Sequence, residues 1–101
     1  MLETPELNAP NQHPTLIEII DLLGHDKISE LNFENSEKTR VNFTHNQKKF
    51  NIELEEAGYG EAISLEVKDN DKNEELGFFN LSMFNFEEQI GLIVKTILNY
   101  D

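Results

Sequence analysis

The order of apolar and polar residues along the chain predicts two helices that flank a block of strands. Residues 15–24 and 85–100 read as helices, whereas residues 28–83 alternate between apolar and polar side chains, as half-buried strands do. Residues 1–14 contain three prolines and no apolar period. We therefore expect a flexible N-terminal arm at 1–14 and a single domain at 15–101.

The segment at residues 85–100 predicts a helix with one apolar face. Asn85 is a favourable N-cap residue, and Glu88, three positions later, completes a capping-box pattern. At about 100° per residue, one side of this helix collects Phe86, Ile90, Ile93, Val94, Ile97 and Tyr100. Lys95 and Asn99 fall on the opposite side together with Glu88. Such a helix must bury its apolar side, and the strands before it offer the surface.

The segment TLIEIIDLLG, residues 15–24, predicts a shorter helix that is apolar on more than one side. Thr15 and Glu18 form a second capping-box pattern, and Gly24 is a natural end. Only Glu18 and Asp21 interrupt the apolar residues. We expect this helix either to be buried on most sides, or to cover the core and also meet another chain.

Between the helices, the alternation predicts five strands with short polar connections. The first four strands have one consistent apolar parity, formed by Leu31 and Phe33; Val41, Phe43 and His45; Phe50, Ile52 and Leu54; and Ile63, Leu65 and Val67. The fifth strand, residues 76–83, changes parity, which predicts a bulge near Gly77–Phe79 or burial on both faces. Short connections favour hairpins. The expected fold is therefore α+β, a five-stranded antiparallel meander with the N-terminal and C-terminal helices on one face.

Composition and charge restrict the possible compartment and partners. The chain has no cysteine, which excludes disulfides and thiolate chemistry, and no apolar run approaches the roughly 20 residues of a membrane span. Because residues 1–14 do not resemble a signal peptide, we expect a cytoplasmic protein. The net charge is −12, and residues 50–75 hold nine acidic residues against Lys68 and Lys72. This charge disfavours direct binding to nucleic acid or to a membrane and favours a basic protein partner.

The strand parity also predicts an acidic face on the sheet. If the apolar residues face the helices, the intervening glutamates point outward together, and acidic loop residues extend the charge. The predicted partner-binding residues are Glu30, Glu34, Glu53, Glu55, Glu66, Asp69, Asp71, Glu74 and Glu75. This face either keeps the protein soluble or docks on a cationic cleft that normally holds nucleic acid. In size and charge alone, the chain resembles toxin-immunity proteins and phage-encoded nuclease inhibitors, which work in the second way.

The aromatic cluster at residues 78–86 is too large to point inward from one strand. We expect one or two exposed apolar anchors for a partner among Phe79, Phe84 and Leu92. Leu92 is included because it lies on the polar side of the C-terminal helix.

No catalytic or metal-binding pattern emerges from the remaining residues. The serines lack a surrounding motif, and the carboxylates occupy solvent positions. The three histidines are not spaced along the chain as metal ligands usually are; they are His13, His25 and His45. The segment from Asp69 resembles a calcium loop only superficially. It departs from the pattern at two positions, because Glu74 stands where the loop needs glycine and Asn80 stands where it needs an acid. We expect no enzyme, no metal site and no cofactor.

These patterns favour a small acidic inhibitor or immunity-type factor that blocks a basic site on a partner protein. The alternative is a homodimeric structural or regulatory module that uses the apolar first helix and the aromatic cluster. The first hypothesis predicts salt-sensitive binding to a partner. The second predicts a dimer that survives high salt, because apolar burial is not screened.

Overall fold

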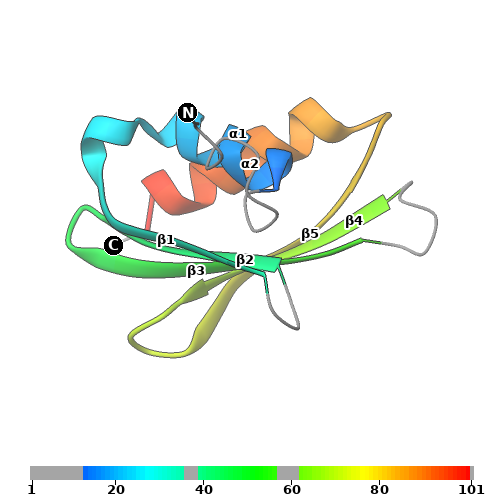
Figure 1. Cartoon of the computed structure of the whole chain (residues 1–101). Coiled ribbons are helices and arrows are strands. Elements are labelled where there is room, and N and C mark those ends of the chain that lie inside the picture. Colours follow the sequence, from blue (N-terminus) through cyan, green and yellow to red (C-terminus); the bar gives the residue numbers. More distant parts are fainter. Residues whose placement is uncertain (1–12, 36–38, 57–61, 101) are drawn as a thin grey trace, which may run out of the picture.

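A five-stranded antiparallel sheet carries both α-helices on one face, and no described helix or strand covers its other face, which we call the open face (Figure 1). The computed structural model describes residues 13–35, 39–56 and 62–100. The elements are α1 (Pro14–Leu23), the 3-10 turn η2 (His25–Lys27), β1 (Ile28–Asn35), β2 (Thr39–His45), β3 (Lys48–Glu56), β4 (Ala62–Asp69), β5 (Glu74–Ser82) and α2 (Phe86–Leu98). The strands lie in chain order, β1-β2-β3-β4-β5, so the predicted α+β meander is confirmed. Of the predicted N-terminal arm, residues 1–12 lie outside the described residues.

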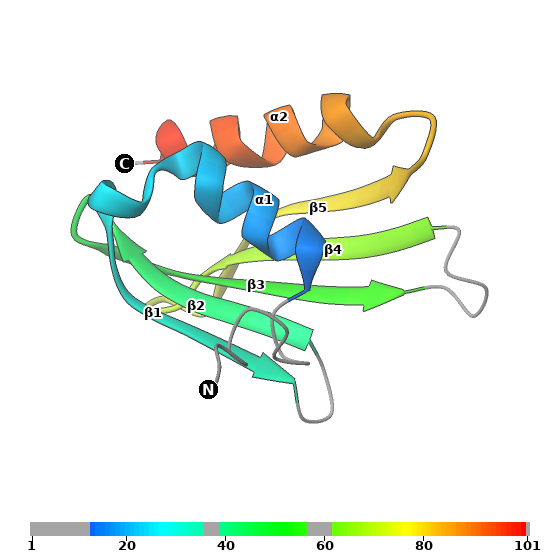
Figure 2. The same cartoon turned by 45° about the horizontal axis from the view of Figure 1, so that its top comes forward.

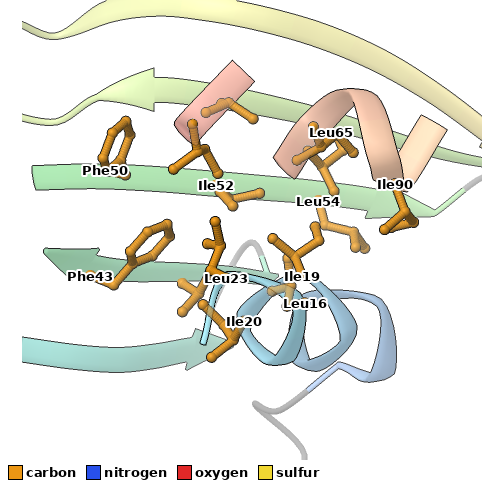
Figure 3. Close-up of a cluster of buried hydrophobic side chains, with 14 of the residues drawn as sticks. Leu16, Ile19, Ile20, Leu23, Phe43, Phe50, Ile52, Leu54, Leu65 and Ile90 are labelled. Carbon is orange, nitrogen blue, oxygen red and sulfur yellow. The ribbon is translucent and has the colours of Figure 1, made fainter. Parts of the chain in front are cut away.

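The core fills the space between the sheet and the two helices, which lie side by side (Figures 2 and 3). Its buried apolar residues are Leu16, Ile19, Ile20, Leu23, Val41, Phe43, Phe50, Ile52, Leu54, Leu65, Val67, Leu81, Ile90, Ile93 and Ile97. Phe43 stacks on Phe50 with ring centroids 5.5 Å apart, and Tyr100 meets Phe50 edge-on at 5.8 Å. The predicted apolar side of the C-terminal helix is therefore confirmed as the side that packs on the sheet.

α1 begins earlier than the capping-box pattern predicts, because His13 rather than Thr15 is its N-cap. Nδ1 of His13 accepts the Thr15 backbone N–H at 3.1 Å, and Pro14 occupies the first helical position, where a missing N–H is tolerated. Since Nδ1 accepts this hydrogen bond, it carries no hydrogen, so the ring N–H is on Nε2, which lies 2.9 Å from the Glu56 carboxylate. His13 therefore ties the start of α1 to the end of β3.

Asn85 stands at the N-cap position of α2 as predicted, but its side chain does not cap the helix. Its Oδ1 accepts the Ser82 backbone N–H at 2.7 Å, and its Nδ2 donates to the Asn80 carbonyl at 3.3 Å. The predicted capping box is therefore wrong in its contacts. Asn85 instead fixes the connection between β5 and α2.

β1 departs from the predicted alternation at an irregularity in its pairing with β2, between Ser29 and Asn32. Glu30 has a positive φ of 54° there, and Leu31 remains 38% exposed instead of joining the core. Phe33, beyond the irregularity, packs against the core as predicted. The prediction for Leu31 is wrong because a bulge shifts the parity of the strand by one residue.

β5 contains a bulge, as one of the two predicted alternatives, but the bulge is centred on Leu76, one residue before the predicted range Gly77–Phe79. Val67 pairs with Gly77 while the next residue, Lys68, pairs with Glu75, so Leu76 is the extra residue. Leu76 and Phe79 both pack against the core. A Cβ atom on Gly77 would lie 2.8 Å from the Phe79 ring, so the ring occupies the space that the glycine leaves. The bulge thereby sends the neighbouring Phe78 to the open face.

Candidate functional site

The strand register decides which side chains share the open face. Residues directly opposite one another on neighbouring strands point to the same side of a sheet. One row therefore crosses all five strands through Glu34, Arg40, Glu53, Glu66 and Phe78. The adjacent row contains Asn32, Asn42, Asn51, Lys68 and Glu75. The open face thus combines an acidic row with an amide-rich one.

Two glutamates face each other in the middle of the acidic row. Glu53 pairs directly with Glu66 across β3 and β4, an arrangement that costs stability because like charges repel. Arg40 offsets this charge from one side, with Nη2 3.5 Å from Glu53 and Nε 3.8 Å from Glu34. Lys68 lies 3.9 Å from Glu66. These ion pairs are long, and the buried Nε of Arg40 has no hydrogen-bond partner among the described residues.

Three glutamates converge on one hollow of the open face. Glu53, Glu55 and Glu66 line it together with Ser64 and Phe78, and its volume is about 70 Å³. Phe78 is 57% exposed. Carboxylates beside an exposed aromatic ring suit a cationic side chain, because they accept charge-assisted hydrogen bonds and the ring face attracts the cation. We call this site the acidic hollow.

Side-chain hydrogen bonds of the amide-rich row connect β1, β2 and β3 on the open face. Asn51 donates to Asn42 at 2.7 Å, and Asn42 donates to the Glu34 carboxylate at 3.1 Å. Asn32 donates to the same carboxylate at 3.2 Å. Farther along β1, Glu30 accepts the Thr44 hydroxyl at 2.6 Å. Glu30 and Glu34 therefore stabilise the sheet as well as adding charge to its open face.

Asp69 lies on the helix-covered side and is only 4% exposed, unlike a loop residue available to a partner. Its Oδ1 accepts the backbone N–H groups of Asp71 at 2.9 Å and Lys72 at 3.0 Å, and its Oδ2 accepts the Tyr100 hydroxyl at 2.5 Å. The Tyr100 hydroxyl, followed by the Lys72 N–H, lowers the pKa of Asp69. The hydrogen bond to Asp69, together with desolvation, raises the pKa of Tyr100 to about 12. Asp69 therefore holds the β4–β5 turn and the end of the described chain.

The nine acidic residues predicted to bind a partner thus divide into two groups. The open face carries Glu30, Glu34, Glu53, Glu55, Glu66 and Glu75. Asp69 and its pairing partner Glu74 lie toward Tyr100, and Asp71 lies in the exposed turn. The structure therefore assembles the strand glutamates and separates Asp69, Asp71 and Glu74 from them.

The predicted apolar anchors also divide. Phe84 is 92% exposed and Leu92 is partly exposed, whereas Phe79 packs against the core. Sequence reasoning missed Phe78 and Met83, and Met83 is 82% exposed. The parity of β5 could not distinguish Phe78 from Phe79, because the position of the bulge decides which ring faces outward.

Comparisons with protein-family models, with curated proteins and with solved structures found no match. Across residues 13–35, 39–56 and 62–100, no three histidine, aspartate or glutamate side chains are grouped as metal ligands would be. Neither α-helix of the described chain has the length and apolar character needed to cross a bilayer. The geometry of the open face is therefore the basis for inferring a function.

Proposed function

We propose that the protein is a cytoplasmic inhibitor or immunity-type factor whose open sheet face blocks a basic site on a partner protein. The observation that carries the proposal is the acidic hollow, where Glu53, Glu55 and Glu66 meet beside the exposed ring of Phe78. A lysine or arginine of the partner that enters the hollow would contact both the carboxylates and the ring. Because like charges on neighbouring strands cost stability, folding alone does not favour this arrangement.

The placement of the charge on strands supports binding to a preformed surface. Hydrogen bonds between strands hold the backbone of the glutamates, so less conformational entropy is lost on association than for charges on a loose segment. The net charge of −12 adds long-range attraction to a basic partner, which raises the association rate at low salt. A site that normally holds nucleic acid is basic for the same electrostatic reason and belongs to the class of partner that fits.

The homodimeric alternative has less support from the surface of α1. Four of the apolar residues of α1 are buried against the sheet and α2, namely Leu16, Ile19, Ile20 and Leu23. Ile17 is half-buried. Among the large apolar side chains of α1, Leu22 is the one that is exposed. A single exposed leucine is an ordinary surface feature.

The proposal is tested by capturing the partner at two salt concentrations. The immobilised full chain should capture a basic protein from lysate of the native host at low salt and release it in about 1 M NaCl, where screening is strong. The double variant Glu53→Lys, Glu66→Lys should abolish capture and remain folded by circular dichroism. The neutral variant Glu53→Gln, Glu66→Gln keeps the side-chain shapes and should weaken binding at least about tenfold.

A matched control separates the open face from net charge alone. Glu18 and Asp26 are exposed residues of α1 and η2, and Glu18→Lys, Asp26→Lys makes the same change in net charge. This control should bind almost as well as the wild type. Equal losses in the two Lys double variants, or normal binding by Glu53→Lys, Glu66→Lys, would overturn the proposal.

A further inference from the structure

A groove opens where β4 begins and β5 ends, beside the start of α2. Its volume is about 680 Å³, and its lining is mainly apolar, including Ile63, Leu81, Met83, Phe84 and Phe86. Met83 and Phe84 are the two most exposed large apolar side chains of the described residues. Clustered exposed apolar residues mark interaction sites, whereas isolated ones do not. We call this site the apolar groove.

The connection that presents Phe84 is held by hydrogen bonds. Oδ1 of Asn85 accepts the Ser82 backbone N–H at 2.7 Å, and the Ser82 hydroxyl accepts the Phe84 backbone N–H at 3.3 Å. Nδ2 of Asn85 also donates to the Asn80 carbonyl. The backbone under Phe84 is therefore fixed before any partner arrives, which reduces the entropy lost on binding.

The charge around the apolar groove is acidic. Glu87 and Glu88, exposed in the first turn of α2, line an adjoining hollow of about 390 Å³ together with Met83 and Phe84. None of the described residues that line the groove or this hollow is basic. A second copy of the chain would bring like charges together, at a net charge of −12 per chain. The charge therefore favours an occupant that carries lysine or arginine beside its apolar residue.

Some lining residues of the apolar groove and of the acidic hollow lie close together along β4 and β5. Ser64 lines the acidic hollow, and Ala62, two residues earlier on the same face of β4, lines the groove. On β5 their pairing partners are Asn80 and Ser82, and the Ser64 hydroxyl donates to Asn80 at 3.1 Å. Two residues along a strand span about 7 Å. A partner that reaches around this end of the sheet can therefore contact both sites, although Ile63 and Leu81 of the groove belong to the helix-covered face.

We infer that the apolar groove receives an apolar side chain of the same basic partner, presented beside lysine or arginine residues that face Glu87 and Glu88. This inference rests on the proposed function and adds a chemical description of the partner. Phe84 and Met83 contribute apolar contact that salt does not screen, whereas the acidic hollow contributes electrostatic attraction that salt does screen. The partner is thus a basic protein with an exposed leucine, methionine or aromatic residue in its basic site.

The test uses random peptides displayed on phage, selected on the immobilised full chain at low salt. Enriched peptides should carry a large apolar residue flanked by lysine or arginine. A synthesised peptide of the enriched type should bind Phe84→Ala about thirtyfold more weakly than the wild type, as expected for a central anchor. Because Phe84 is almost fully exposed, Phe84→Ala should retain the wild-type fold.

Leu98→Ala is the matched control. Leu98 is an exposed apolar residue like Phe84, but it lies at the far end of α2, about 18 Å along the helix from Phe86. It should bind the peptide within about twofold of the wild type. Equal enrichment on Phe84→Ala, enriched peptides without basic residues, or no enrichment over an unrelated protein would each overturn the inference. A dimer that forms through Phe84 would also overturn it, because the occupant would be a second copy.

The two proposals fail in distinguishable ways. If Glu53→Gln, Glu66→Gln weakens capture of the host protein while Phe84→Ala leaves both capture and peptide binding unchanged, the proposed function stands and the groove inference fails. If Phe84→Ala weakens both while the glutamine variant and added salt have no effect on capture, the open-face proposal fails instead.

Discussion

The two faces of the sheet are built by alternate residues of the same strands, yet one face stabilises the fold and the other is exposed for binding. On its helix-covered face, β3 contributes Phe50, Ile52 and Leu54, which are all buried. On its open face, the same strand contributes Glu53 and Glu55, which line the acidic hollow. Apolar burial stabilises the fold, whereas the paired charges carry a small cost in stability and offer a surface for recognition.

This difference implies that stability and binding can be changed separately. Apolar burial responds weakly to salt, whereas interactions between exposed charges are screened at high ionic strength. Substitutions on the helix-covered face should therefore lower the free energy of unfolding at every salt concentration. Substitutions on the open face should change partner binding strongly and stability only slightly, in a salt-dependent way.

The largest expected effect on stability comes from Phe50→Ala, on the helix-covered face. Phe50 is buried between the rings of Phe43 and Tyr100, so its truncation should lower the free energy of unfolding by about 3–5 kcal/mol. Urea denaturation measures this loss. Glu55→Gln, on the open face of the same strand, should change stability by less than about 0.5 kcal/mol. Comparable losses at the two positions would contradict the division between the faces.

A smaller loss is expected from His13→Ala, at the rim of the helix-covered face. The variant removes the N-cap acceptor of α1 and the contact with Glu56, which should cost about 1 kcal/mol. His25→Ala is a suitable control, because His25 contacts Asp21 one turn away on an exposed surface, and its loss should stay below about 0.5 kcal/mol. Urea titrations of both variants compare them, and a larger loss for His25→Ala would refute the capping role of His13.

On the open face, Arg40→Ala should cost about 0.5 kcal/mol at low salt. It removes the positive charge between Glu34 and Glu53 and leaves neighbouring carboxylates without that offset. The loss should shrink in about 1 M NaCl, because salt screens the remaining repulsion. Arg40→Lys keeps the charge and should lose less. A loss that is independent of salt would indicate that the arginine acts through packing of its stem.

An effect of a different kind is expected from Tyr100→Phe, which should change the pH dependence of stability. Because the pKa of Asp69 is lowered in the folded chain, its contribution is complete above its usual pKa of 3.8 and is lost as the pH falls through the lowered value. Tyr100→Phe removes the largest cause of that shift, so the acid-side loss should be smaller.

Tyr100 makes an opposite contribution at alkaline pH. Because its pKa is raised to about 12, its contribution is complete below its usual pKa of 10.0 and is lost as the pH rises through about 12. This alkaline loss should disappear in Tyr100→Phe. Melting temperatures measured from acid to alkaline pH test both the Asp69 and the Tyr100 contributions. Wild-type and variant profiles that differ only by a constant offset would contradict this linkage.

Local patterns predicted most of the fold, because β2, β3, β4 and α2 repeat one period without interruption. The same patterns failed at Leu31 and could not assign Phe78, since a bulge in β1 or β5 reverses the faces beyond it. They also misplaced Asp69, whose partner Tyr100 lies 31 residues away. The contact between His13 and Glu56 was missed for the same reason, because Glu56 lies 43 residues away in the chain.

The sequence by itself determined the alternation that separates an apolar face from an acidic one, and the apolar side of the C-terminal helix. These features depend on local periods of two and of about 3.6 residues, which are visible in any short window of the chain. Only the tertiary structure decided that Glu53, Glu55 and Glu66 meet beside Phe78, and that Phe84 borders an open groove. Those neighbours come from different strands, and the register of the hydrogen-bonded ladder, including its bulges, sets which of them meet.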